Sequence, residues 1–145
     1  MRAILQRVTE ASVSVSGKVV GSCGQGLLIL LGVGHHDTEE SARKLWDKVW
    51  RLRIFSDEQG KTNRSLADID GEVLIVSQFT LFADCRRGNR PSFTDAAPAE
   101  QGERLYECFC SLAERDASHV GRGVFGADMQ VSLVNDGPFT VWLER

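Results

Sequence analysis

Two hydroxyl groups and an amide follow one another in the segment Ser77-Gln78-Phe79-Thr80, directly after a run of apolar residues. Hydrolysis of an ester needs hydrogen-bond donors aimed at the oxygen on which negative charge develops, and backbone N–H groups at a strand end can supply them. A strand end whose hydroxyls bond to the local backbone has the same composition and is the commoner arrangement. No histidine lies near in sequence, so the segment does not suggest a Ser-His-Asp triad. Taken alone, it leaves ester hydrolysis open.

A second polar segment, Asn135-Asp136-Gly137-Pro138, separates two apolar runs. Gly-Pro between two strands predicts a tight turn. The bond before proline is also the one type of peptide bond whose cis form costs only about 0.5–1 kcal/mol, although trans remains its usual state. A cis bond here would hold backbone carbonyls in a rigid arrangement that suits an ammonium group.

Positive charge gathers locally in one set of residues: Lys61, Arg64, Arg86, Arg87 and Arg90. Such a set binds phosphate in some proteins and is simply solvated in others. Both interpretations stay open from the sequence.

Neither the cysteines nor the histidines have the spacing of a metal site. The chain has no C-x-x-C pair, so reduced thiols are expected rather than a disulfide framework or a zinc site. His35 and His36 are adjacent, and adjacent histidines seldom converge on one ion. We therefore expect no metal and no cofactor.

Strands and two helices must position these segments. Alternating and continuous apolar runs predict strands at residues 3–8, 11–16, 19–22, 27–33, 53–55, 72–77, 128–134 and 139–143. A helix capped by Asp37 or Thr38 is expected to reach Trp50, and a second is expected at residues 98–115. Trp46 and Trp50 share one apolar helical face, which favours core packing over a base-stacking platform. The pattern predicts a single β-rich α/β domain over residues 1–145, with a curled, barrel-like sheet.

Composition excludes some classes of protein. The chain has 145 residues, 42% hydrophobic and 26% charged, which is typical of a soluble single domain. No signal peptide is visible, and the longest apolar run, Leu27 to Val33, is too short to span a bilayer. We expect a cytoplasmic protein with no membrane partner. A net charge of −3 argues against bulk coating of nucleic acid but allows a local grip on one RNA end.

Together the motifs resemble the D-aminoacyl-tRNA deacylase family, and the match runs essentially end to end. The resemblance is carried by Leu5-Gln6-Arg7-Val8, Leu31-Gly32-Val33, Arg53-Ile54-Phe55, Ser77-Gln78-Phe79-Thr80-Leu81, Arg90-Pro91-Ser92-Phe93 and the run from Val131 to Pro138.

The resemblance implies a homodimer that hydrolyses D-aminoacyl-tRNA at the tRNA 3′ end to free D-amino acid and tRNA. One subunit would insert a cis Gly137-Pro138 unit, within the motif that starts at Asn135, into the other subunit's site. The carbonyls of Gly137 and Pro138 would accept the ammonium group of a D-amino acid and clash with any L side chain. Glycine has no side chain to clash, so glycyl-tRNA would pass. Arg7 matches the arginine that holds this motif.

The same resemblance implies the roles of the other candidate residues. Ser77 to Thr80 would lie beside the ester, with Gln78 and backbone N–H groups around Phe79 polarising its carbonyl or holding its oxyanion. Thr80 would need a base to act as nucleophile, and none is near, so we favour water attack assisted by the substrate's ribose 2′-hydroxyl. Phe125 and Met129 resemble residues that line the terminal adenosine pocket.

Three other functions are weighed. A related editor of L-alanyl-tRNA, with a trans Gly-Pro, carries a different residue in place of Phe79. A nucleic-acid-binding module is disfavoured by the acidic balance and the lack of a basic tail, so no DNA partner is expected. A small-molecule esterase with Thr80 as nucleophile would act on free D-amino acid esters without RNA.

Overall fold

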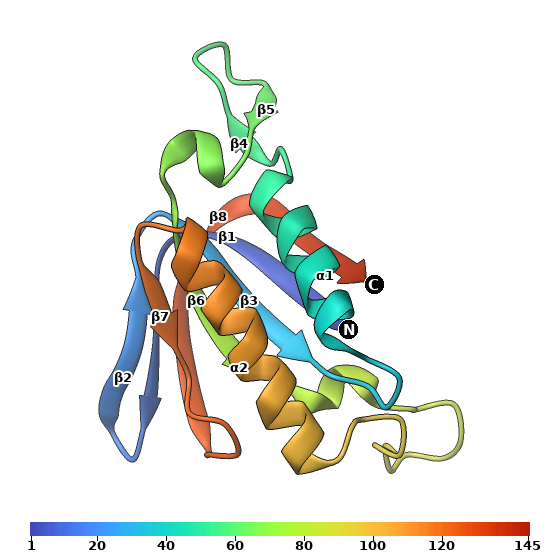
Figure 1. The fold of residues 1–145 in the computed structure, drawn as a ribbon. Helices are drawn as coiled ribbons and strands as arrows, with labels where there is room; N and C mark the ends of the chain where they lie inside the picture. Colours follow the sequence, from blue (N-terminus) through green and yellow to red (C-terminus); the bar gives the residue numbers. More distant parts are fainter.

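The sheet is organised around β1 (Arg2–Val15), which pairs with three other strands in this computed structural model of residues 1–145 (Figure 1). The first half of β1 pairs with β3 (Gly26–Gly32), and the second half pairs with β2 (Lys18–Cys23). On its other side, β8 (Met129–Glu144) runs antiparallel to β1 along its whole length. The long strand β1 therefore joins β2, β3 and β8 into one sheet.

The sheet curls until its two edges meet. β3 is followed by two parallel neighbours, β6 (Glu72–Ser77) and β7 (Val120–Arg122), so that the order is β2-β1-β3-β6-β7. β2 and β7 then touch, because a side chain on Gly21 would place its Cβ 2.5 Å from the carbonyl oxygen of Arg122. The result is a single α/β domain with a nearly closed, barrel-like sheet, as the sequence predicts.

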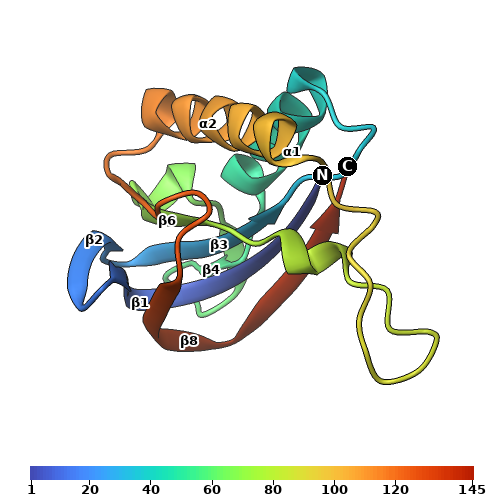
Figure 2. The same ribbon diagram turned by 90° about the horizontal axis from the view of Figure 1, so that it is seen from below.

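Two helices, α1 (Glu39–Arg51) and α2 (Ala99–Asp116), lie side by side over one face of the sheet (Figure 2). Trp46 is buried against α2, where its ring meets Phe109 edge-on with centroids 5.6 Å apart. Its ring also stacks on Trp50 at 5.7 Å. The tryptophans therefore serve the core, as their helical spacing predicts, and the Thr38 side chain caps α1.

A second, smaller core fills the inside of the curled sheet. Its members are Val8, Ala11, Val13, Cys23, Leu28, Leu74 and Val76. Since β3 and β6 face the helices on one side and this inner core on the other, both of their faces are buried. This explains why their sequences are continuous apolar runs rather than alternating ones.

The chain does not reverse its direction at residues 135–138, so the prediction of a turn between two strands there is wrong. β8 continues in one direction past this segment, so residues 128–134 and 139–143 belong to the same strand. Gln6 pairs with Thr140 while Val8 pairs with Asn135, so two steps along β1 match five along β8. The surplus residues form a bulge, for which glycine, proline and asparagine are as well suited as for a turn.

Other boundaries also differ from expectation. Residues 3–8 and 11–16 form the single strand β1, because β8 keeps the ladder continuous across the bulge. The strand expected at 53–55 is the two-residue β4 (Phe55–Ser56), paired with the unexpected β5 (Thr62–Arg64). β7 was not expected either. Two short 3-10 helices complete the chain: η1 (Ala67–Ile69) and η2 (Phe79–Phe82).

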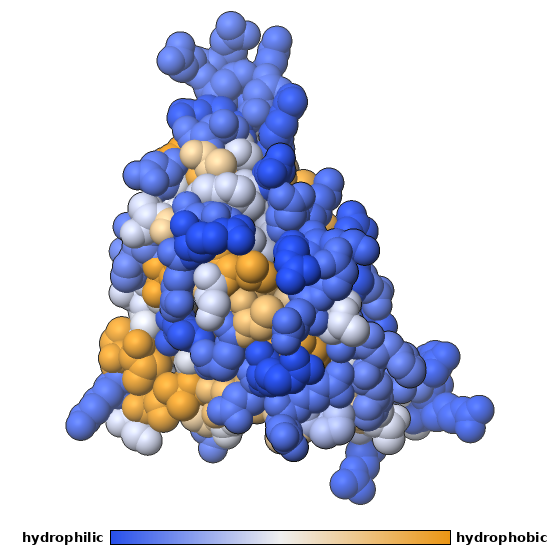
Figure 3. All heavy atoms as spheres, in the orientation of Figure 1, coloured by the Kyte–Doolittle hydropathy of each residue, from blue (hydrophilic) through white to orange (hydrophobic).

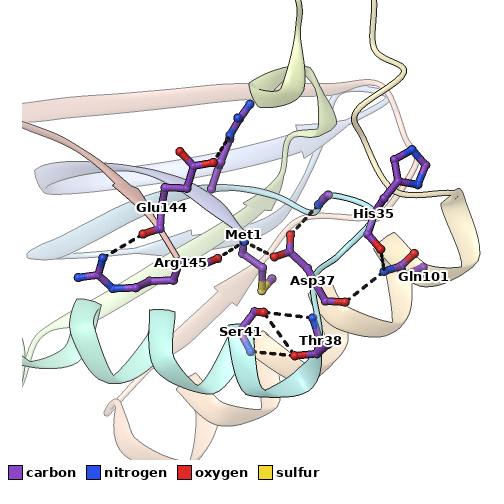
Figure 4. Close-up of polar contacts among 10 residues, drawn as sticks. Met1, His35, Asp37, Thr38, Ser41, Gln101, Glu144 and Arg145 are labelled. Carbon is purple, nitrogen blue, oxygen red and sulfur yellow. Dashed lines mark hydrogen bonds and ion pairs between the residues drawn. The ribbon is translucent and has the colours of Figure 1, made fainter.

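The two ends of the described chain lie side by side (Figures 1 and 4). The backbone N–H of Arg145 donates to the carbonyl oxygen of Met1 at 3.0 Å. The Met1 ammonium group donates to the Asp37 carboxylate and to the Arg145 carbonyl. Asp37 in turn accepts from the backbone N–H of Gly34, so this cluster fixes the chain just before α1. Among the helices, none has the length and apolarity needed to cross a membrane.

Candidate functional site

A pocket of about 550 Å³ opens beside the end of β6. Ser77 and Gln78 at the strand end, and Phe79 at the start of η2, form one part of its wall. Phe125, from the connection between β7 and β8, and Met129, the first residue of β8, form another. The structure thus brings together five of the residues that the sequence proposed for the site, from two separate parts of the chain.

The pocket wall is mainly apolar and carries an aromatic pair. The rings of Phe79 and Phe93 meet edge-on with centroids 5.1 Å apart, and Phe79 is 57% exposed. Asp128 is the only charged residue in the wall. A flat, uncharged group such as a nucleobase suits such a surface, because aromatic faces stack on bases without regard to sequence.

The polar groups at the strand end contact one another. The Gln78 amide nitrogen donates to the Thr80 hydroxyl at 2.5 Å, and Thr80 is not part of the pocket wall. An amide does not take up a proton in either orientation, so this contact does not activate Thr80 as a nucleophile. The first N–H groups of a helix have no acceptor within it, so those of Phe79 and Thr80 are free of bonds inside η2.

Tyr106, which the sequence reasoning missed, holds two parts of the wall together. Its hydroxyl donates to the carbonyl oxygen of Ile75 at 2.9 Å and lies 3.2 Å from that of Gly123. Its ring packs against Phe125 with centroids 6.0 Å apart. Burial raises the pKa of the Tyr106 phenol well above its usual range, so the hydroxyl stays a donor. A buried tyrosine in an apolar helix face is the sequence signal for such a tie.

The other predicted residues form a separate cluster around Arg7. The guanidinium of this buried arginine donates from Nε to the carbonyl oxygen of Asp136 and from Nη2 to that of Gly137, each at 3.0 Å. The Asn135 side chain donates to the Arg7 carbonyl oxygen at 2.9 Å. The Gly137–Pro138 bond is cis, as the resemblance implies.

Every side of the Arg7 guanidinium is occupied. Its Nη1 donates to the carbonyl oxygen of Ile54 at 2.6 Å, and its Nε lies 2.9 Å from the Asp136 carboxylate. The guanidinium carbon lies 4.5 Å from the centre of the Phe139 ring. Arg7 therefore fixes the bulge of β8 to both β1 and the segment before β4.

The space above Gly137 is open. Gly137 and Pro138 are exposed, and a Cβ added to Gly137 would have one neighbour within 4 Å, the Asn135 Oδ1 atom at 3.9 Å. Nothing within this chain requires glycine at that position.

One chain does not bring the two clusters together. None of Arg7, Asn135, Gly137 and Pro138 lies in the wall of the pocket. Leu31 pairs with both Ser77 and Ala3, whereas Arg7 pairs with Leu27, four residues away along the strands. Four residues of strand span about 13 Å.

The predicted concentration of positive charge is divided in the structure. Lys61 and Arg64 lie on the β4–β5 hairpin, and the three arginines lie on the loop after η2, which projects from the other end of the molecule (Figure 1). A basic groove that the sequence reasoning missed runs along α1 and is lined by Arg43, Lys44, Lys48, Arg51, Arg115 and Arg145, together with acidic residues.

Metal-ligating side chains do not converge. No group of three or more His, Cys, Asp or Glu side chains could hold an ion. All four cysteines are free, and burial raises the pKa of the Cys23 and Cys110 thiols to about 11. These two thiols are neutral near pH 7 and belong to the core.

Comparison with known proteins adds independent findings. The model of the D-Tyr-tRNA(Tyr) deacylase family matches residues 4–144. A protein of Roseiflexus castenholzii named D-aminoacyl-tRNA deacylase is 60% identical over 144 residues, which is 99% of this chain and 92% of that protein. One of the same name from Thermotoga petrophila is 57% identical, over 99% of this chain and 97% of that protein.

Solved structures show the same fold. A structure described as a c-Myc DNA Unwinding Element Binding Protein is 41% identical, with a TM-score of 0.94, and the match covers 100% of this chain and 99% of that one. A structure described as a probable eukaryotic D-amino acid tRNA deacylase is 21% identical, with a TM-score of 0.83, and the match covers 98% and 97%. The second likeness concerns the fold alone.

Proposed function

This chain belongs to the D-Tyr-tRNA(Tyr) deacylase family, and from that premise we propose that it hydrolyses the ester bond of D-aminoacyl-tRNA to free D-amino acid and tRNA. The observation that carries the proposal is the pocket in which Ser77, Gln78 and Phe79 face Phe125 and Met129. It places hydrogen-bond donors beside an apolar surface that suits a terminal nucleobase. Since tRNA is charged and used in the cytoplasm, the enzyme acts there.

The ester lies at the polar end of this pocket. Gln78 and the N–H groups of Phe79 and Thr80 stabilise the oxyanion, because these groups lie at the strand end where η2 begins. Thr80 does not attack, since its hydroxyl contacts only an amide. Water attacks with help from the 2′-hydroxyl of the terminal ribose, and the protein contributes positioning. Phe125 and Met129 hold the adenine.

Selection of the D-configuration comes from the Gly137-Pro138 unit of a second subunit. Its carbonyl oxygens accept the ammonium group of the substrate, and an L side chain would collide with this unit. The open space above Gly137 and the separation of this unit from the pocket of its own chain both support insertion into a partner. Glycyl-tRNA passes the same test, because glycine has no side chain.

The exposed strand β8 supports a homodimer. This 16-residue strand pairs only with β1, so one edge is left without a partner. Leu133, Val134 and Trp142 on β8 are each at least 38% exposed. A long, exposed, apolar edge strand is a template for pairing with another chain. Two copies that cover each other here would bring each Gly137-Pro138 unit toward the partner's pocket.

The test is hydrolysis of matched D- and L-tyrosyl-tRNA by the purified protein, with and without a chelator. We expect fast release from the D ester alone, at a rate that the chelator does not change. Equal activity on both esters, or none on either, would contradict the proposal. L-alanyl-tRNA would then be the next substrate, followed by nucleic-acid binding, starting with DNA, which the description of one related structure names.

A further inference from the structure

A closed loop projects from the protein beside the pocket, and we call residues 84–92 the arm (Figures 1 and 2). Its two ends are joined by a pair of backbone hydrogen bonds. The Asp84 N–H donates to the Ser92 carbonyl oxygen at 2.7 Å, and the Ser92 N–H donates to the Asp84 carbonyl oxygen at 3.0 Å. Gly88 in the arm adopts a φ of +65°, a left-handed conformation that favours glycine. The arm is therefore a defined turn with a closed base.

The base of the arm is anchored to the pocket. Phe93, the next residue, contacts Phe79 in the pocket wall. Further on, the Ala97 N–H donates to the Val33 carbonyl oxygen at 2.9 Å, and the His35 ring bonds to the Thr94 carbonyl oxygen at 2.7 Å. The base of the arm is therefore fixed at the wall of the pocket.

The three arginines of the arm differ in their partners. Arg86 forms two hydrogen bonds with the Asp84 carboxylate, at 2.8 and 2.7 Å, and the pKa of Asp84 falls to about 2 as a result. Arg87 and Arg90 are exposed, and neither guanidinium forms an ion pair or a hydrogen bond within the protein. The arm therefore presents two free guanidinium groups, while the third arginine, Arg86, is bonded to Asp84 at the base of the arm.

We propose that the arm binds the phosphodiester backbone of the unpaired 3′ end of tRNA, with Arg87 and Arg90 as the phosphate ligands. This inference rests on the proposed function, because it assigns the backbone that leads to the terminal nucleotide in the pocket. The planar fork of arginine matches the geometry of phosphate oxygens. In a protein of net charge −3, two free cations on an arm whose base adjoins the pocket attract the RNA locally.

The groove along α1 is the rival surface. Most of its cations already have acidic partners: Arg43 and Lys44 contact Glu40, Arg51 contacts Asp47, and Arg115 contacts Asp116. Pairs spaced three or four residues apart are typical of a solvated helix face. The arm is favoured because its two cations are free and its base adjoins the pocket.

The experiment compares the double variant R87Q/R90Q with K44Q/K48Q, which removes the same charge from α1. Affinity for deacylated tRNA is measured by fluorescence anisotropy over a range of salt concentrations. Single-turnover hydrolysis is measured on D-tyrosyl-tRNA and on 3′-D-tyrosyladenosine, which has no phosphate. Thermal unfolding confirms that each variant is folded.

For R87Q/R90Q we expect the Kd for tRNA to rise about tenfold, and the slope of log K against log salt to lose about 1.4, which is 0.7 for each single-strand phosphate contact. The maximal rate on D-tyrosyl-tRNA and the rate on 3′-D-tyrosyladenosine should stay unchanged. K44Q/K48Q should match the wild type.

Unchanged tRNA affinity in R87Q/R90Q, or a larger loss in K44Q/K48Q, would overturn the assignment of the arm. Equal losses on tRNA and on the adenosine ester would overturn it too, because the arginines would then act on the ester. If the arm variant loses tRNA affinity but the wild type hydrolyses no D ester, the arm assignment stands and the proposed function fails.

Discussion

The hydroxyl of Tyr106 on α2 donates a hydrogen bond to the carbonyl oxygen of Ile75 on β6, across 2.9 Å of buried space. Ile75 lies directly before Val76 and Ser77, which line the pocket. The Gly123 N–H donates to the same carbonyl at 2.9 Å, so one oxygen joins the helix, the strand and the segment that leads to Phe125. The pocket wall thus depends on a residue that does not line it.

Replacing Tyr106 tests the importance of its hydrogen bond to Ile75. Tyr106→Phe keeps the ring and removes the hydroxyl, so we expect the free energy of unfolding to fall by about 1 kcal/mol. The Km for D-tyrosyl-tRNA should rise more than kcat falls, because the variant loosens the pocket without touching the ester. Urea unfolding and steady-state kinetics measure the two effects. A variant as stable and as active as the wild type would show that the tie is dispensable.

Replacing Arg7 should lower the free energy of unfolding more than replacing Tyr106 does. Arg7→Lys keeps the charge, but a single ammonium group cannot reach the carbonyls of Ile54, Asp136 and Gly137 together. Buried acceptors that lose their donor should lower the free energy of unfolding by about 2–4 kcal/mol. The ratio of D- to L-ester hydrolysis should fall as the bulge loosens. Arg51→Lys, at an exposed ion pair with Asp47, is the control and should cost under about 1 kcal/mol.

Gly137→Ala separates activity from stability. The added methyl group meets open space within the chain, so the free energy of unfolding should change by under about 1 kcal/mol. Hydrolysis of D-tyrosyl-tRNA should fall at least roughly tenfold, because the methyl group occupies space that the proposed function gives to the substrate. Gly21→Ala is the opposite case, since its Cβ would lie 2.5 Å from the Arg122 carbonyl oxygen, and it should destabilise the fold. Full activity in Gly137→Ala would argue against the insertion of this unit into a site.

Thr80→Ala distinguishes the two hydrolytic mechanisms. We expect the single-turnover rate to fall by less than about tenfold, since the hydroxyl has no neighbouring base. The wild-type enzyme should hydrolyse a substrate that ends in 2′-deoxyadenosine with a far larger loss of single-turnover rate. If hydrolysis vanishes in Thr80→Ala while tRNA binding survives, the mechanism assisted by the RNA hydroxyl is wrong.

Alkaline pH should destabilise the protein through its buried thiols. Burial raises the pKa of Cys23 and Cys110 from 9.0 to about 11, so the unfolded chain loses these protons first. The stabilisation is fully present below pH 9 and is lost as the pH rises toward 11. Urea unfolding under reducing conditions at several pH values measures this loss. The double variant Cys23→Ala/Cys110→Ala should show a flatter dependence, and an identical slope would contradict the assignment.

Apolar patterns in the sequence predicted the buried strands and the inner helix face well. β3 and β6 are buried on both faces and therefore read as unbroken apolar runs, and Trp46 and Trp50 marked the inner face of α1. The course of β8 was not predictable, because Gly137-Pro138 fits a bulge as well as a turn. The choice depends on pairing with β1, whose partner residues are more than a hundred positions away in sequence.

The candidate site shows a similar division. Ser77 and Gln78 were visible as polar residues at a strand end, but nothing local linked them to Phe125 or Met129, and only the resemblance suggested it. Sequence proximity also grouped basic residues that the fold separates, and it could not show that Asp84 holds Arg86 while Arg87 and Arg90 stay free. The Asp84–Arg86 pair depends on the local conformation of the loop, and the separation of the basic residues depends on the fold, and composition reveals neither.

The pairing of β1 with β8 also sets an order of events during synthesis on the ribosome. β1 ends at Val15 and β8 begins at Met129, so at bacterial or eukaryotic elongation rates one strand waits on the order of ten seconds for the other. Throughout that interval the Arg7 guanidinium has no Asp136 or Gly137 carbonyl to bind, and one side of β1 is a bare template for unwanted pairing. The nascent chain is therefore most exposed to aggregation, and most dependent on chaperones, until its final strand emerges.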